Sequence, residues 1–154
     1  MLNSGDVVDD FELPDETGTP RRLSSLLESG PIVLFFYPAA MTSGCTAEAC
    51  HFRDIAKDFA EVGAHPVGIS GDTVDKQKQF ADKHSFGYPL LADTDKKVAD
   101  LFGVSRGIGP IKLRFAKRAS FVIDTDRKVL AVIKSETSME KHADEALAVL
   151  KARA

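Results

Sequence analysis

The run Ile32-Val33-Leu34-Phe35-Phe36 constrains the fold more than any other stretch of the chain. It is continuously apolar and rich in β-branched and aromatic residues, and its length suits a strand that is buried on both faces. Pro38 ends this strand. After the polar step Thr42-Ser43-Gly44, apolar residues recur at the spacing of an amphipathic helix, at Ala49, Phe52, Ile55, Ala56 and Phe59. The sequence therefore predicts a buried central strand that leads directly into a helix.

The rest of the chain supplies further elements around that strand. Before the strand, the pattern predicts a small hairpin within the first twenty residues and a short helix at Leu23 to Leu27. After the cysteine-containing helix, it predicts a strand at Ala64 to Ser70, a polar helix at Thr73 to His84 and an extended segment at Tyr88 to Asp93. A short helix around Val98 to Phe102 and a long loop at Gly103 to Pro110 are predicted to follow. The pattern then predicts a hairpin formed by Ala119 to Asp124 and Val129 to Ile133, and a closing helix around Ala143 to Leu150. This order indicates an α/β fold in which helices flank both faces of a central mixed β-sheet.

Length and composition limit the possible classes of protein. Because 154 residues, 44% of them hydrophobic, can bury a core and show no shift in composition, we expect a single domain over residues 1–154. The formal net charge of -3, with acidic and basic residues interspersed, predicts no nucleic-acid partner. No apolar run approaches the length of a membrane span, and the N-terminus does not resemble a secretion signal. We therefore expect a soluble, cytoplasmic protein with no membrane partner.

The chain has two cysteines, Cys45 and Cys50, and both fall in the first turns of the predicted helix. Cys45 shares the inward face with Ala49 and Phe52, near the helix N-terminus, where unpaired N–H groups and the macrodipole favour negative charge. A thiol in this position is expected to ionise readily. If both cysteines are helical, their Cα atoms lie roughly 8–9 Å apart, whereas a disulfide needs about 7 Å or less. The pair is therefore either two unrelated thiols or a switch in which oxidation melts a helix end.

The segment around the cysteines resembles the active-site segment of the peroxiredoxins. The matching residues are Pro38-x-x-x-Thr42-x-x-Cys45, preceded by Phe36-Tyr37 and followed by Thr46-x-Glu48-x-Cys50-x-Phe52-Arg53-Asp54. A second cysteine five residues on is similar to the Q type, also called the bacterioferritin comigratory protein type. The resemblance extends along the chain through Gly5-Asp6, Phe11-x-Leu13-Pro14, Gly68-Ile69-Ser70, Leu90-Leu91-Ala92-Asp93 and Arg118-Ala119-Ser120-Phe121-x-Ile123-Asp124. It implies a thioredoxin-like fold with an N-terminal β-hairpin, and a thiol peroxidase that acts on hydrogen peroxide and organic hydroperoxides.

The resemblance also implies a role for each residue around the nucleophile. Cys45 would attack the O–O bond as a thiolate and become a sulfenic acid. Thr42 would hydrogen-bond the thiolate or the peroxide, and Pro38 would shield the sulfur from water. The backbone N–H groups of Gly44 and Cys45 would hold the peroxide oxygens. Arg118 would supply a fixed positive charge; if its strand runs antiparallel to the central strand, the start of one lies beside the end of the other.

The remaining implied roles concern the recycling of the nucleophile. Glu48, one turn beyond Cys45, would orient an arginine instead of acting as an acid. Cys50 would resolve the sulfenic acid as an intramolecular disulfide, and thioredoxin or a similar dithiol would reduce that disulfide. No metal, haem or flavin cofactor is implied. As partners we expect the hydroperoxide substrate and the dithiol reductant, with the protein itself a monomer or a weak homodimer.

Ionisation of the thiol cannot account for a peroxidase by itself. A free thiol with a pKa near 8.5 is about 3% thiolate at pH 7, so full ionisation adds roughly thirty-fold, about 2 kcal/mol. The remainder should come from Arg118, Thr42 and backbone donors that stabilise charge on the departing oxygen.

Other interpretations of the same residues stay open at this point. Cys45 could be an inert buried thiol, Cys50 an unrelated one, and Arg118 and Glu48 solvated surface residues. The two cysteines could also serve a general thiol-disulfide oxidoreductase, or a redox sensor or holdase-like binding module. The four histidines, His51, His65, His84 and His142, are not clustered in the sequence and are interpreted as ordinary histidines without a metal site. Gly107-x-Gly109 lacks the third glycine of a nucleotide-binding fingerprint.

Overall fold

Strand β3 (Ile32–Phe36) lies at the centre of a five-stranded sheet, as its apolar run predicts. The computed structural model describes residues 1–108 and 113–153. The strand order is β5-β4-β3-β8-β9, with β4 at His65–Ser70, β5 at Leu90–Ala92, β8 at Ala119–Ile123 and β9 at Val129–Lys134. Strands β4 and β5 run parallel to β3, and β8 and β9 continue the sheet by antiparallel pairing. The expected mixed sheet and its late hairpin are confirmed.

Successive side chains of β3 enter two different hydrophobic cores. Val33, Phe35 and the following Tyr37 belong to one cluster of buried residues, and Ile32, Leu34 and Phe36 to the other. This alternation follows from the two-residue period of a strand. Because both faces of the sheet are covered, both sets of side chains are apolar, and the strand is a continuous hydrophobic run.

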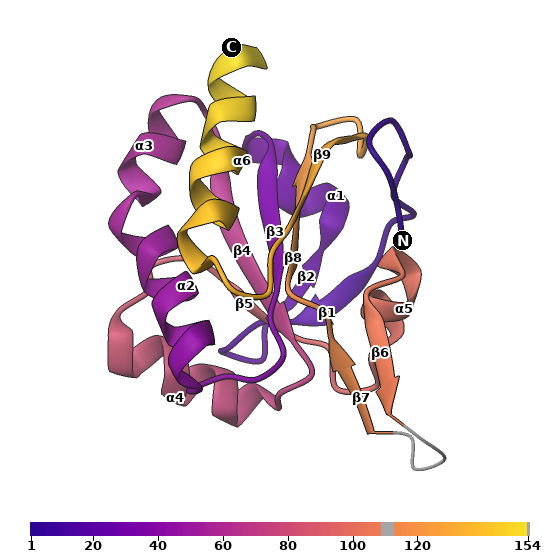
Figure 1. Cartoon of the computed structure of the whole chain (residues 1–154), viewed down its shortest axis with the longest axis vertical. Helices are drawn as coiled ribbons and strands as arrows, with labels where there is room; N and C mark the ends of the chain where they lie inside the picture. The colour runs from indigo at the N-terminus through magenta and orange to yellow at the C-terminus, as the bar shows by residue number, and fades with distance from the viewer. Residues whose placement is uncertain (109–112, 154) are drawn as a thin grey trace.

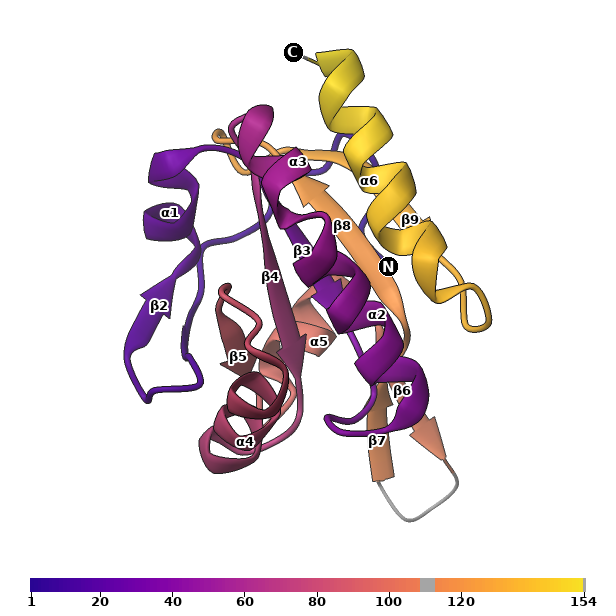
Figure 2. The same ribbon diagram turned by 90° about the vertical axis from the view of Figure 1, so that its left-hand side faces the viewer.

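The helices form a layer on each face of the sheet (Figures 1 and 2). One face is covered by helices α2 (Ser43–Asp54), α3 (Ala56–Glu61) and α6 (Met139–Arg153), with α4 (Val74–His84) beside strand β5. The opposite face is covered by the N-terminal segment together with helix α1 (Leu23–Leu26), the 3-10 helix η1 (Leu27–Ser29) and helix α5 (Lys97–Phe102). Helices α2 and α6 pack directly against each other. Residues contributed by both helices can therefore meet at the sheet.

Two short hairpins lie outside the central sheet. Strands β1 (Glu12–Pro14) and β2 (Pro20–Arg22) form the expected N-terminal hairpin. Strands β6 (Ser105–Ile108) and β7 (Leu113–Ala116) form a second antiparallel pair, where the sequence suggested only a loop at Gly103 to Pro110. The prediction of a loop was wrong for 105–108, because Gly107 and the neighbouring glycines concealed a strand that gains its hydrogen bonds from β7. Gly109 and Pro110 of the expected loop lie outside the described residues.

The helix that carries the cysteines is shorter than its apolar stripe suggested. The stripe runs on to Phe59, but α2 ends at Asp54, and Ile55 adopts φ -107° and ψ 15° before α3 begins. The break changes the helix direction while Phe52 and Phe59 stay in one core, with their rings stacked at a centroid distance of 5.9 Å. Within the described part of the chain, no helix combines the length and the apolar character needed to cross a membrane.

Candidate active site

Cys45 occupies the first turn of helix α2, as the sequence predicts. The helix begins at Ser43, and Thr42 precedes it in an extended conformation. The side chain of Cys45 is fully buried (0% exposed) in the core beneath α2 and α6. Both cysteines are free thiols. The sulfur therefore lies near the N-terminal end of a twelve-residue helix, where the peptide dipoles favour a negative charge.

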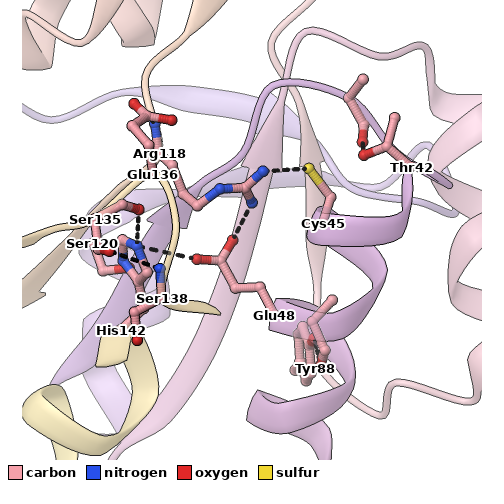
Figure 3. A network of polar contacts seen from close by, with 12 residues as sticks. Thr42, Cys45, Glu48, Tyr88, Arg118, Ser120, Ser135, Glu136, Ser138 and His142 are labelled. Atoms are coloured by element: carbon pink, nitrogen blue, oxygen red, sulfur yellow. Dashed lines mark hydrogen bonds and ion pairs between the residues drawn. The ribbon is translucent and has the colours of Figure 1, made fainter. Parts of the chain in front are cut away.

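Arg118 reaches Cys45 from the neighbouring strand. Antiparallel pairing aligns Phe36 of β3 with Ala119 of β8, so the residue before β8 lies beside the end of β3. The guanidinium is 8% exposed and lies between a sulfur and a carboxylate (Figure 3). Its Nη2 donates to Sγ of Cys45 at 3.4 Å, and its Nη1 donates to Oε1 of Glu48 at 3.2 Å. The topology thus brings together three residues that the sequence analysis singled out.

The three groups form a cluster with one fixed positive charge and two acids. Burial raises the pKa of Glu48 to about 8, although the nearby charge of Arg118 acts in the opposite direction. Burial alone would lower the pKa of Arg118, but the neighbouring Cys45 and Glu48 outweigh burial and raise it. Arg118 therefore stays charged, while Glu48 is readily neutralised. A neutral Glu48 leaves the guanidinium charge available to the sulfur.

The hydroxyl of Thr42 bonds the backbone of its own loop. Thr42 Oγ1 donates to the backbone carbonyl oxygen of Ala39 at 2.8 Å, instead of to the sulfur of Cys45. This bond closes the loop between β3 and α2, in which Met41 adopts a positive φ of 66°. Ala40 N donates to Oδ2 of Asp72 at 2.7 Å and fixes the same loop from β4. No sequence pattern indicates this role for Asp72, because the contact joins two separate loops at the same edge of the sheet.

Pro38 and Gly44 occupy the two ends of this loop. Pro38 is partly buried at the end of β3. A methyl group built on Gly44 would lie 3.3 Å from Nη2 of Arg118 and 3.6 Å from the sulfur of Met139. Glycine at this position thus allows the backbone of α2 to approach the guanidinium closely. The backbone N–H groups of Gly44 and Cys45 belong to the first turn, whose N–H groups lack partners within the helix.

Cys50 lies on the same helix but in different surroundings. It is partly exposed and lines a hollow of about 460 Å³ together with Ala47, His51, Asp54 and residues 137–140. Because α2 is helical from Ser43 to Asp54, the geometry of the helix holds the two cysteines too far apart for a disulfide. Tyr88 donates its hydroxyl hydrogen to the carbonyl oxygen of Ala49 at 2.6 Å and braces the helix between them.

His142 is the residue that the sequence analysis missed. Its side chain is fully buried (0% exposed), and its Nε2 lies 3.5 Å from Oε2 of Glu48. We interpreted the four histidines as ordinary because they are scattered in the sequence. The available signal was helical spacing, since His142 lies four residues before Ala146 and eight before Leu150 on the buried face of α6. Within residues 1–108 and 113–153, no three His, Cys, Asp or Glu side chains gather as a metal site requires.

Comparison with known proteins places this geometry among peroxide-reducing enzymes. Residues 4–132 match the model of the AhpC/TSA family. A Mycobacterium tuberculosis protein assigned by name to the peroxiredoxins is 66% identical over 151 residues, which cover 98% of this chain and 97% of the relative. The chloroplastic peroxiredoxin Q of Arabidopsis thaliana is 39% identical over 151 residues, covering 98% of this chain and 68% of the relative.

Solved structures show the same similarity in three dimensions. The crystal structure of the peroxidoxin BcpB from Mycobacterium tuberculosis superposes with a TM-score of 0.94 at 63% identity, covering 99% of this chain and 98% of the other. A bacterioferritin comigratory protein from Xanthomonas campestris, described with alkyl peroxide reduction activity, gives a TM-score of 0.84 at 26% identity and covers 96% and 99%. The thioredoxin-like fold expected from the sequence is confirmed.

Proposed function

Because the chain belongs to the AhpC/TSA family and is a thiol-dependent peroxidase of the peroxiredoxin Q type, we propose that Cys45 is the residue that attacks the peroxide. The observation that carries this assignment is the 3.4 Å contact between Nη2 of Arg118 and the buried sulfur of Cys45. A cation held against a sulfur at a helix N-terminus favours the thiolate, which is the reactive form.

The first step forms an S–O bond and breaks an O–O bond. The thiolate of Cys45 attacks the terminal oxygen of a hydroperoxide, and the other oxygen leaves as hydroxide or alkoxide and takes up a proton. Arg118 faces the place where charge develops on the leaving oxygen, and the N–H groups of Gly44 and Cys45 are the proposed donors to the peroxide. We assign to Thr42 the closure of the loop and, through its hydroxyl oxygen, contact with bound peroxide. Pro38 shields the sulfur from water.

The second step returns the enzyme to its starting state. The thiolate of Cys50 attacks the sulfenic sulfur of Cys45, a disulfide forms, and the sulfenic oxygen leaves as water. Helix α2 must unwind locally for this step, since the helix keeps the two residues apart. The sulfenic oxygen takes a proton from solvent as it leaves. A dithiol such as thioredoxin then reduces the disulfide and is itself oxidised to a disulfide, which returns Cys45 as a thiolate and Cys50 as a thiol. The hollow beside Cys50 supports access of that reductant.

Substrate, assembly and compartment complete the proposal. We assign hydrogen peroxide and organic hydroperoxides as substrates, supported by the alkyl peroxide reduction named for the Xanthomonas campestris relative. No further partner is needed for the chemistry, and we propose a monomer or a weak homodimer, acting as one domain. A cycle that depends on a dithiol reductant fits a reducing compartment, for which we propose the cytoplasm.

The test of the proposal is steady consumption of hydrogen peroxide in the presence of a thioredoxin system. We expect Cys45→Ser to abolish turnover. Cys50→Ser should form one sulfenic acid per chain and then stop cycling with thioredoxin. Mass spectrometry of the oxidised wild-type protein should find the Cys45–Cys50 disulfide. Retained turnover in Cys45→Ser would overturn the assignment, and a single stoichiometric disulfide without turnover would identify a redox sensor.

A further inference from the structure

A series of buried polar contacts leads from the active site to helix α6 (Figure 3). Arg118 contacts Glu48 through Oε1, which leaves Oε2 on the far side of the carboxyl group. Oε2 has no hydrogen-bond partner among the described residues. The nitrogen Nε2 of His142 lies 3.5 Å from it, and both side chains are 0% exposed. Because both groups are shielded from solvent, hydration does not offset the free-energy cost of an unfavourable contact between them.

The ring of His142 is held on both of its nitrogens. Nε2 lies 2.8 Å from the carbonyl oxygen of Ser135, and Nδ1 lies 2.8 Å from Oγ of Ser120. A carbonyl oxygen can only accept, so Nε2 carries the hydrogen. Burial lowers the pKa of His142, so the ring is neutral and Nδ1 accepts from the Ser120 hydroxyl. The same Nε2–H edge is turned toward Oε2 of Glu48.

We propose that His142 is a positioning residue for the peroxidase reaction: through Glu48, it sets how much of the positive charge of Arg118 reaches the sulfur of Cys45. The inference rests on the proposed roles of Cys45 and Arg118. The guanidinium contacts both Cys45 and Glu48 but carries only one positive charge. An ionised Glu48 therefore competes with the thiolate for that charge, whereas a neutral Glu48 does not. The Nε2–H of His142 bonds the carbonyl oxygen of Ser135, and its dipole, 3.5 Å from Oε2, favours the ionised form of Glu48 and so shifts the pH at which this competition begins.

The charged surroundings of the pair are contributed by several elements. The titratable groups that act on Glu48 or His142 come from the start of β8, the segment before β5, the connection between β9 and α6, and α6 itself: Arg118, Tyr88, Glu136 and Lys141. Cys45 of α2 acts on Arg118. Arg118 favours the ionised form of Glu48, and Glu136 opposes it. Removal of the His142 N–H should shift the ionisation of Glu48 to higher pH by at most about one pH unit, the value for a full hydrogen bond to a charged group.

The experiment measures the rate constant for oxidation of Cys45 by hydrogen peroxide in a single turnover, over a range of pH. In the wild-type protein, we expect the rate constant to fall as the pH rises through about 8, where Glu48 ionises. In Glu48→Gln this fall should be absent, because the amide cannot ionise. A fall that persists in Glu48→Gln would overturn the inference.

Two substitutions of His142 form a matched pair. Glutamine can place its amide nitrogen near the position of Nε2, whereas the shorter asparagine reaches only the position of Nδ1. We expect His142→Gln to keep the fall near its wild-type pH and His142→Asn to shift it upward by up to about one pH unit. A merely structural role would affect both variants alike, and equal profiles would refute the proposal. If His142→Asn does not fold, the profile of His142→Gln is compared with that of Ser120→Ala, which removes the hydroxyl on Nδ1 and leaves Nε2 in place; a profile shifted equally in both would refute the proposal.

Failure of this inference can be distinguished from failure of the proposed function. If Cys45 is not the nucleophile, Cys45→Ser keeps its turnover, and mass spectrometry finds the first oxidation at another residue. If only the role of His142 is wrong, Cys45 is oxidised normally and the pH profile does not respond to the glutamine and asparagine variants.

Discussion

The positive charge of Arg118 offers the most direct test of the site. Arg118→Met removes the guanidinium but keeps an unbranched side chain of similar length. It leaves no unpaired buried charge, because burial already raises the pKa of Glu48 to about 8, and loss of the arginine raises it further. We therefore expect the variant to fold, with helix α2 intact by circular dichroism.

The size of the effect follows from the contact distance. At the 3.4 Å between Nη2 and Sγ, two unit charges interact by about 5 kcal/mol at an effective dielectric constant of about 20. A hydrogen bond to a charged group contributes less after the cost of desolvation, about 2–3 kcal/mol. We therefore expect the rate constant for oxidation of Cys45 to fall by about 30- to 150-fold.

The assay can separate two ways in which Arg118 could act. If Arg118 only promotes ionisation of the thiol, the loss of rate in Arg118→Met cannot exceed about thirty-fold at pH 7, and it disappears at a pH where any thiol is ionised. If it stabilises the departing oxygen, the loss persists there. Stopped-flow measurement in the Cys50→Ser background, over a range from about pH 6 to about pH 10, isolates this first step.

The control for this experiment is Arg118→Lys, which keeps the charge but loses the planar fork that contacts Cys45 and Glu48 with separate nitrogens. It should lose about tenfold, less than the methionine variant, since a charge-assisted contact is weakened by about 1.4 kcal/mol. A methionine variant with a wild-type rate at every pH would remove Arg118 from the mechanism.

Three further predictions concern helix α2 and its partners. Burial raises the pKa of Glu48 from 4.5 to about 8, so the contribution of protonated Glu48 to the free energy of unfolding is fully present below pH 4.5 and is lost as the pH rises to about 8. Urea unfolding should show this loss, at most roughly 5 kcal/mol, in the wild type and not in Glu48→Gln. Tyr88→Phe removes the hydrogen bond to Ala49, so the Cys45–Cys50 disulfide should form about fivefold faster after one equivalent of peroxide; an unchanged rate would mean that this bond does not hold the helix. Phe52→Ala removes a ring stacked on Phe35 at 4.2 Å and should lower the free energy of unfolding by about 3–5 kcal/mol in denaturant titrations; a loss below 1 kcal/mol would contradict the packing.

The sequence predicted the parts of the fold that depend on local pattern. The run Ile32–Phe36 is a central strand because its pattern is apolar on both faces, and antiparallel pairing with β8 then brings Arg118 to Cys45 as expected. The β6–β7 pair was missed because its strands are stabilised by each other, and nothing in the glycine-containing segment 103–110 indicates that partner. A local pattern identifies which faces are buried, but pairing energy comes from a distant segment.

The site shows the same division between local and distant interactions. Cys45 and Glu48 are one turn apart on α2, so helix geometry alone predicts that both face Arg118. The link to His142 depends instead on how α6 packs against α2, which no local pattern specifies. The bond from Thr42 to Ala39 is local, because a threonine hydroxyl next to a turn can bond a nearby backbone carbonyl.

The contacts that prepare Cys45 for attack also oppose the next step of the cycle. Glu48 ties the first turns of α2 to Arg118, and Tyr88 ties Ala49 to the neighbouring sheet edge. Both contacts keep α2 helical, and a helical α2 keeps Cys50 away from Cys45. Both contacts must therefore loosen before the disulfide can form. Variants that weaken the helix should gain in disulfide formation and lose in peroxide attack, so the two rates should change in opposite directions across the set.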